Sequence, residues 1–122
     1  MPDEKDAAQE KLESVKKKLP LGTYQHYKGS YYTVFALSLK EDTLDVLVHY
    51  YSHEKKTRWS RTIEDFTAHV PEAPYEFREG RFKFIREAHP IQLLRAAGFD
   101  SLIEGFEAMS GTFEFFKRIR GG

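Results

Sequence analysis

Two short stretches carry the side chains best suited to binding a ligand. Residues 22–29 place two tyrosines, a histidine and a lysine between two glycines, and a later stretch holds a tryptophan two residues before an arginine. Aromatic rings offer stacking faces, while lysine and arginine bind phosphate or carboxylate groups. We expect a small anionic or aromatic ligand, with a nucleotide as the specific prediction, or else a protein partner. The predicted ligand-binding residues are Tyr24, His26, Tyr27, Lys28, Trp59 and Arg61.

The alternative for the same residues is purely structural. Tyrosine and tryptophan also cap small cores at strand ends, where their polar atoms bond to the backbone. In that case, substitutions in the cluster would change stability and nothing else.

No catalytic or metal-binding pattern accompanies these residues. The five histidines have no cysteine beside them and form no His-Glu-x-x-His motif, so no metal site is predicted. No serine lies in a Gly-x-Ser-x-Gly elbow. Adjacent carboxylates such as Glu64 and Asp65 suit helix caps and turns rather than paired acid–base chemistry. The sequence therefore predicts a protein that is not an enzyme and uses no cofactor.

The end of the chain suggests a different function. It finishes with Gly121 and Gly122, preceded by the basic residues Arg118 and Arg120. This tail resembles that of ubiquitin-like modifiers, whose two terminal glycines thread through narrow enzyme channels. The resemblance implies conjugation through Gly122, with an activating enzyme and a protease as partners. The expected order of strands and helices does not match the β-grasp fold of those modifiers.

Composition limits the class of protein further. A chain of 122 residues suits one domain, and its 19 basic and 19 acidic residues give a formal net charge of zero. This balance argues against bulk nucleic-acid binding. No apolar run approaches the ~20 residues of a membrane span, no signal peptide is evident, and cysteine is absent. We expect a cytoplasmic protein that does not associate with membranes.

The spacing of apolar residues predicts the elements that position the cluster. A helical pattern over residues 3–19 ends at Pro20, and helical spacing returns over 91–97, ending at Gly98. Thr62 is placed to cap a short helical turn. A capping box at Ser101 predicts a further helix, while residues 112–120 fit either a strand or a helix. Alternation predicts strands near 24–26, 31–39, 44–51, 59–61 and 81–85.

These patterns predict an α+β fold. We expect a small antiparallel SH3-like barrel or curled sheet, with an N-terminal amphipathic helix and C-terminal helices that cover one barrel opening. The predicted parts are an N-terminal helix or arm (1–19), a small β domain (20–86) and a C-terminal helical extension and tail (87–122).

Several motifs, in order, resemble one known family. They are Gly22-x-Tyr24-x-His26-Tyr27-Lys28-Gly29, Leu47-Val48-x-Tyr50, Trp59-x-Arg61 and the pair Arg81-Phe82. Residues 20–86 resemble the bacterial family called domain of unknown function 1653. The resemblance implies a compact β barrel or curled sheet with a shared polar and aromatic cluster, and an accessory role in the cytoplasm. It implies no catalytic chemistry. Where the family often has Trp-Val-Arg-Pro, this chain has Thr62 in place of the proline.

Overall fold

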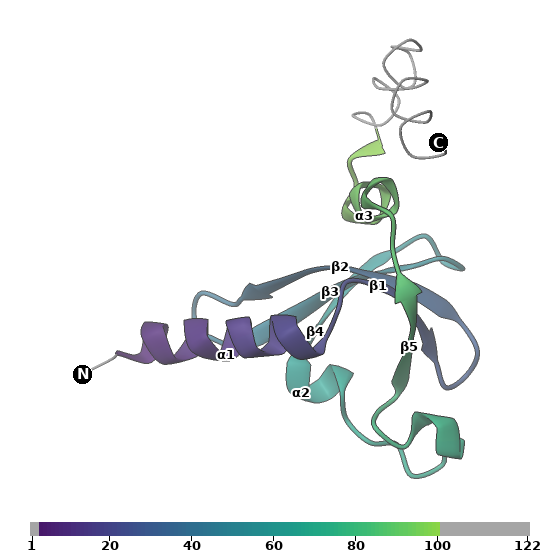
Figure 1. Ribbon diagram of the computed structural model, residues 1–122, viewed down its shortest axis with the longest axis horizontal. Coiled ribbons are helices and arrows are strands. Elements are labelled where there is room, and N and C mark those ends of the chain that lie inside the picture. The colour runs from purple at the N-terminus through teal and green to yellow at the C-terminus, as the bar shows by residue number, and fades with distance from the viewer. Residues whose placement is uncertain (1–2, 101–122) are drawn as a thin grey trace.

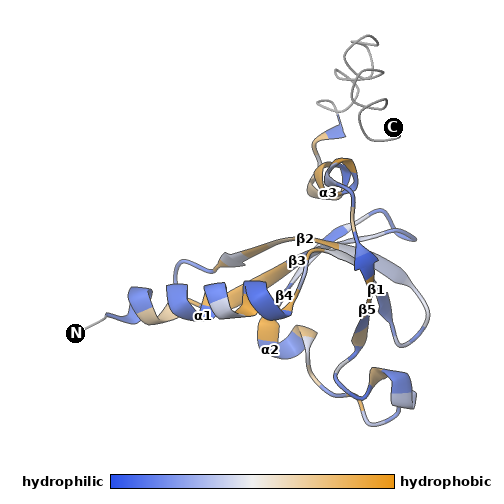
Figure 2. Cartoon of the chain, in the orientation of Figure 1, coloured by the Kyte–Doolittle hydropathy of each residue, from blue (hydrophilic) through white to orange (hydrophobic). Residues whose placement is uncertain are grey.

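A long amphipathic helix begins the part of the chain described by the computed structural model, residues 3–100 (Figure 1). Helix α1 spans Glu4–Lys18, and Asp3 caps it by accepting a hydrogen bond from the backbone N–H of Asp6. In Figure 2 this helix is mostly hydrophilic. Ala8 and Leu12 are buried where α1 contacts β2 and β3. The predicted N-terminal helix is confirmed, and its narrow apolar stripe is the side that docks.

Five strands form one antiparallel sheet. They are β1 (Gly22–His26), β2 (Tyr31–Leu39), β3 (Val46–Ser52), β4 (Arg58–Thr62) and β5 (Phe82–Glu87). The spatial order is β4-β3-β2-β1-β5, so β4 and β5 are the two edges and pair with no further strand within residues 3–100. The predicted α+β class is confirmed in its curled-sheet form, because the sheet does not close into a barrel.

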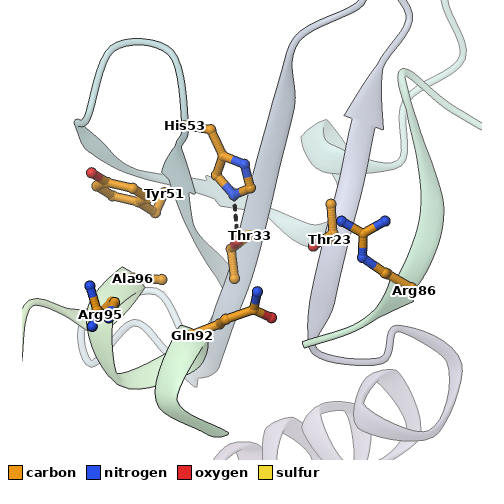
Figure 3. Close-up of a pocket in the computed structure, with 8 residues that line it drawn as sticks. All are labelled: Thr23, Thr33, Tyr51, His53, Arg86, Gln92, Arg95 and Ala96. Carbon is orange, nitrogen blue, oxygen red and sulfur yellow. Dashed lines mark hydrogen bonds between the residues drawn. The ribbon is translucent and has the colours of Figure 1, made fainter. Parts of the chain in front are cut away.

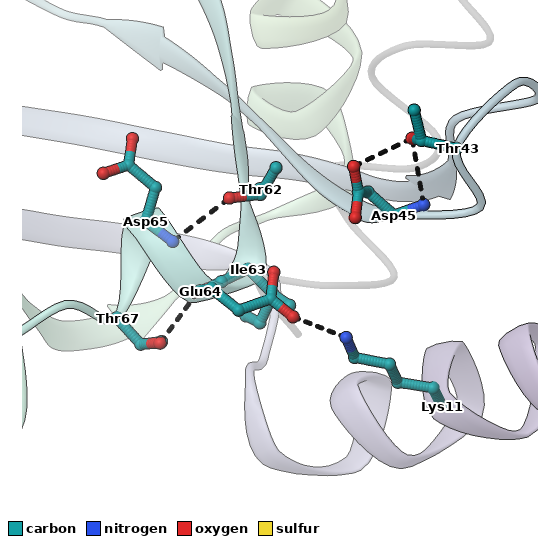
Figure 4. A network of polar contacts seen from close by, with 8 residues as sticks. All are labelled: Lys11, Thr43, Asp45, Thr62, Ile63, Glu64, Asp65 and Thr67. Carbon is teal, nitrogen blue, oxygen red and sulfur yellow. Dashed lines mark hydrogen bonds and ion pairs between the residues drawn. The ribbon is translucent and has the colours of Figure 1, made fainter.

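A short helix occupies the space between the two edges. Helix α2 (Ile63–Phe66) follows β4 directly, and Thr62 caps it by accepting the N–H of Asp65 at 3.2 Å. Phe66 from α2 stacks on Phe82 of β5, with ring centroids 4.2 Å apart and an interplanar angle of 3°. Lys11 of α1 forms an ion pair with Glu64 of α2 (Figure 4). Helix α2 therefore lies between the two edge strands. In a closed barrel, β4 and β5 would instead pair directly with each other.

The core is built largely from rings. Its buried cluster consists of Tyr24, Val34, Val48, Tyr50 and Phe66. Several ring pairs meet edge to face, including Tyr32 with Phe82 at 5.5 Å between centroids. Such pairs stabilise by about 0.5–1.5 kcal/mol beyond the area they bury. The aromatic richness of the sequence thus supplies the packing of the sheet face covered by α1 and α2.

The last described helix lies on the other face of the sheet (Figure 1). Helix α3 spans Pro90–Ala97, is capped by His89 and ends at Gly98, whose φ of +97° suits a residue without a side chain. It contacts β2 and β3. This confirms the predicted helix, but it covers a broad sheet face rather than a barrel opening, since no barrel forms. A short 3-10 helix, η1 (Tyr75–Phe77), precedes β5.

Some predictions fall outside the described residues. These are the helix after Ser101, the ambiguous segment 112–120, and the conjugation site at Gly121 and Gly122. Among residues 3–100, no helix combines the length and the apolar character that crossing a bilayer requires.

Candidate functional site

The predicted cluster begins in the tight turn between β1 and β2. The N–H of His26 donates to the carbonyl of Ser30, and the N–H of Gly29 donates to the carbonyl of His26, each at 2.8 Å. Gly29 has a φ of +109°, a conformation that side chains disfavour. The backbone N–H of Lys28 donates to Nδ1 of His26 at 3.1 Å. Because Nδ1 accepts, the neutral imidazole carries its proton on Nε2.

The His26 ring lies among other rings and near several cations. Its centroid is 4.4 Å from that of Tyr27 and 5.0 Å from that of Phe82. Partial burial lowers the pKa of His26, and the positive charges of Arg81, Lys28 and Arg61 lower it further. The turn therefore sits in a cationic environment, in which the imidazole itself is held neutral.

Two arginines in this environment share one carboxylate. Nε of Arg61 donates to the hydroxyl of Tyr50 at 2.7 Å, and Nη1 of Arg61 donates to Asp65 at 2.7 Å. Nη2 of Arg81 lies 3.8 Å from the other oxygen of Asp65. Nε of Arg81 is buried and has no hydrogen-bond partner within residues 3–100. One carboxylate thus faces two guanidinium groups, and one buried N–H lacks an acceptor.

The structure brings together His26, Tyr27 and Lys28 in the turn, and Arg61 is near enough for its charge to act on His26. Tyr24 does not join them. Its ring is only 3% exposed, its hydroxyl donates to the carbonyl of Pro20 at 2.7 Å, and burial raises its pKa. The alternating pattern places Tyr24 and His26 on the same face of the sheet. In the structure, however, the side chain of Tyr24 is buried in the core.

Trp59 lies apart from the turn on the edge strand β4. It pairs in register with Tyr50, so it projects from the same sheet face as Arg61, and 48% of its surface is exposed. Trp59 is therefore placed beside Arg61 along β4, two residues before it.

Sequence reasoning did not include Arg81 and Asp65 in the site. The Arg81-Phe82 pair in the sequence could have indicated Arg81. Phe82 packs against the core and so holds the neighbouring arginine at the edge of the core. Asp65 was attributed to the first turn of a helix, which is correct but incomplete, since its carboxylate also binds both arginines. In the part of the chain that the structure describes, no group of three or more histidine or carboxylate side chains could hold a metal ion.

Comparison with known proteins places the chain in a family. The family described as "Protein of unknown function (DUF1653)" matches residues 22–84, just over half of the chain. No curated protein matches. A crystal structure of a DUF1653 protein from Bordetella bronchiseptica is similar, with 23% identity, a TM-score of 0.49, and coverage of 61% of this chain and 96% of that one. The matched segment contains the turn, Arg61, Asp65 and Arg81, and on that match this chain belongs to the DUF1653 family.

Proposed function

We propose that this protein is a non-enzymatic binding module that holds a small anionic ligand beside Arg61 and Arg81, the two arginines that share Asp65. The site, called here the double-arginine site, consists of His26, Tyr27, Lys28, Arg61 and Arg81. The observation that carries the proposal is the unequal pairing around Asp65, in which two guanidinium groups meet one carboxylate. A ligand oxyanion would balance the excess positive charge.

The incomplete pairing of Arg81 supports the same conclusion. A buried donor without an acceptor costs about 1–3 kcal/mol, so proteins usually satisfy such groups. The side chain of Arg81 keeps 23% of its surface exposed and that of Arg61 keeps 33%. An anion can therefore approach both guanidinium groups from solvent, and charge-assisted hydrogen bonds to them are the strong kind.

The ring surfaces favour a nucleotide as the ligand. The Tyr27 ring lies against His26, and the ammonium of Lys28 is 5.8 Å from its centroid, which leaves little free stacking face. Trp59 is half exposed and stands two residues from Arg61 on β4, about 7 Å along the strand. A ligand that pairs a phosphate with a flat ring would contact both side chains. The absence of cysteine fits action in the cytoplasm.

A titration of the isotopically labelled full chain tests this proposal. Proton–nitrogen NMR would follow the Trp59 indole N–H and the His26 amide during addition of AMP, ADP, ATP and the matching nucleoside. We expect saturable shifts with the nucleotides and much weaker ones with the nucleoside. Inorganic phosphate is added as a further probe. If it shifts His26 as strongly as the nucleotides do, and the nucleotides leave Trp59 unmoved, the anion site is retained and the nucleotide is refuted. Flat titrations throughout would refute the binding module.

Variants separate binding from folding. Arg81→Gln and Arg61→Gln should each weaken nucleotide binding about tenfold, the loss expected for one strong charge-assisted contact. Lys28→Gln, at an exposed turn position, should weaken it less and fold normally. Arg78→Gln is the matched control, because Arg78 lies outside the site with its guanidinium 4.5 Å from the Tyr75 ring centroid. Equal affinities for all four variants would overturn the assignment of the site.

A further inference from the structure

A polar pocket lies beneath α3, on the face of the sheet opposite the core (Figure 3). Its volume is about 180 Å³, room for about six water molecules. It shares no residue with the double-arginine site. The side chains that determine its chemistry are Thr23, Thr33, His53, Arg86, Gln92 and Arg95.

The floor of the pocket is formed by two buried hydroxyl residues. Thr23 and Thr33 are directly paired across β1 and β2 and are 5% and 4% exposed. The hydroxyl of Thr33 lies 2.6 Å from Nε2 of His53. Polar side chains are seldom buried on a sheet face without a polar partner nearby. Hydroxyl groups and an imidazole here line a hollow rather than fill a core.

The wall from α3 presents a hydrogen-bond donor to this hollow. Oε1 of Gln92 accepts the backbone N–H of His89 at 3.0 Å as part of the helix cap. Because its oxygen is held there, the amino group is the end of Gln92 left for other contacts. Figure 3 shows that amino group pointing toward the space above Thr33.

The opposite wall is cationic. Arg86 on β5 is exposed and lies beside Thr23 in register, and its side chain makes no hydrogen bond or ion pair within residues 3–100. Burial lowers the pKa of the His53 imidazole, and the positive charge of Arg86 lowers that pKa further. Arg95 also lines the pocket, and no acidic side chain of residues 3–100 does. Hydroxyl and amide groups and the guanidinium of Arg86 therefore line a space to which residues 3–100 contribute no carboxylate.

We propose that this pocket binds a compact tetrahedral oxyanion, either free phosphate or the phosphate of a small monoester. The lining offers charge-assisted and neutral donors from three directions, which suits an anion with several acceptor oxygens. It offers no free stacking face, because the guanidinium of Arg58 lies 5.1 Å from the centroid of the one tyrosine in the lining, Tyr51. The ligand class thus differs from that of the double-arginine site, which combines an anion contact with an exposed ring.

The test is an NMR titration of the labelled full chain in phosphate-free buffer. Inorganic phosphate should produce saturable shifts in the His53 ring and in the amides of Thr23 and Thr33, while chloride at equal ionic strength should not. Glycerol phosphate serves as the second arm. Tighter binding of glycerol phosphate identifies a monoester ligand, and binding of inorganic phosphate alone identifies the free anion. Shifts confined to His26 and Trp59, or none at millimolar concentrations of either probe, would overturn the proposal.

Three substitutions sharpen this test. Arg86→Gln should weaken phosphate binding about tenfold. Gln92→Glu keeps an acceptor for the helix cap, since glutamate serves at that position, yet it places a negative charge in the pocket and should abolish binding. Arg78→Gln should bind like the unaltered chain. If Gln92→Glu folds and still binds phosphate normally, the pocket is not the site.

Discussion

The guanidinium of Arg61 donates a hydrogen bond of 2.7 Å to the hydroxyl of Tyr50 on the neighbouring strand. The Tyr50 ring is buried in the core, where it meets Tyr32 and Phe82 edge to face. A surface cation is thereby anchored to the best-packed part of the molecule. The proposed ligand contact is positioned by the core and needs no rearrangement of the arginine.

Tyr50→Phe tests this anchoring. The substitution keeps the ring and removes the acceptor of Arg61, so the free energy of unfolding should fall by about 1–2 kcal/mol. Nucleotide binding should weaken as well, because Arg61 loses a fixed orientation. Urea unfolding and the nucleotide titration measure the two effects. Tyr31→Phe, at an exposed ring on β2, is the control and should change neither.

The elements could be predicted from the sequence where local chemistry decides them. Pro20 ends α1, Gly98 ends α3 and Thr62 caps α2, and each of these signals acts within a few residues. The choice between a closed barrel and a curled sheet could not be made from the sequence, because it depends on Phe66 meeting Phe82 across a long loop. The alternation of apolar residues predicts which side chains share a face of a strand, but it does not predict which other elements cover that face.

The same distinction explains the candidate site. His26 and Lys28 were found because one turn holds them both. Tyr24 was included because alternation cannot show that the rings of Phe66 and Phe84 enclose it. Arg61 and Asp65 lie four residues apart, but the contact of Arg81 with the same carboxylate joins distant segments, which no spacing rule reveals.

Alanine substitutions at two glycines, Gly22 and Gly29, distinguish crowding against neighbouring backbone from conformational strain in a turn. A Cβ added at Gly22 would lie 2.4 Å from the carbonyl oxygen of Arg86 and 2.9 Å from Cα of Glu87, and φ there is +152°. Gly22→Ala should therefore destabilise the fold by more than about 2 kcal/mol. A Cβ at Gly29 meets nothing within 4 Å, so Gly29→Ala should cost only about 1 kcal/mol of conformational strain. Thermal unfolding of both variants measures the difference, and equal losses would contradict the crowding between β1 and β5.

Stability should fall on mild acidification. Burial is the first cause that lowers the pKa values of His26, His49 and His53 in the folded state. The unfolded chain, with histidine pKa values near about 6.5, then binds more protons than the folded chain at lower pH. The contribution of these neutral histidines to stability is complete above about pH 6.5, and it is lost as the pH falls through their lowered pKa values in the folded state. Urea unfolding at several values from about pH 7.5 to 5.5 checks this slope, and a flat or rising profile on acidification would contradict it.

One histidine accounts for a defined part of that slope. His49 lies between two serines on adjacent strands, 2.6 Å from the hydroxyl of Ser38 and 3.0 Å from that of Ser60. His49→Gln keeps a polar side chain between the serines and removes the titrating group. The acid slope should become shallower in this variant, while stability above about pH 7 should change little. An unchanged slope would assign the effect to His26 and His53 alone.

Arg58 should control how firmly α3 is held on the sheet. Its Nε donates to the carbonyl of Ala96 at 2.7 Å and its Nη2 to that of Arg95 at 3.1 Å, which satisfies carbonyls at the end of the helix. Arg58→Ala should speed hydrogen exchange in α3 about tenfold for each 1.4 kcal/mol lost, and leave the amides of β2 and β3 protected. Arg78→Ala is the control, and equal exchange in the two variants would refute the role of Arg58. Because α3 carries Gln92, Arg58→Ala should also weaken phosphate binding beneath the helix, although Arg58 is not part of the pocket lining.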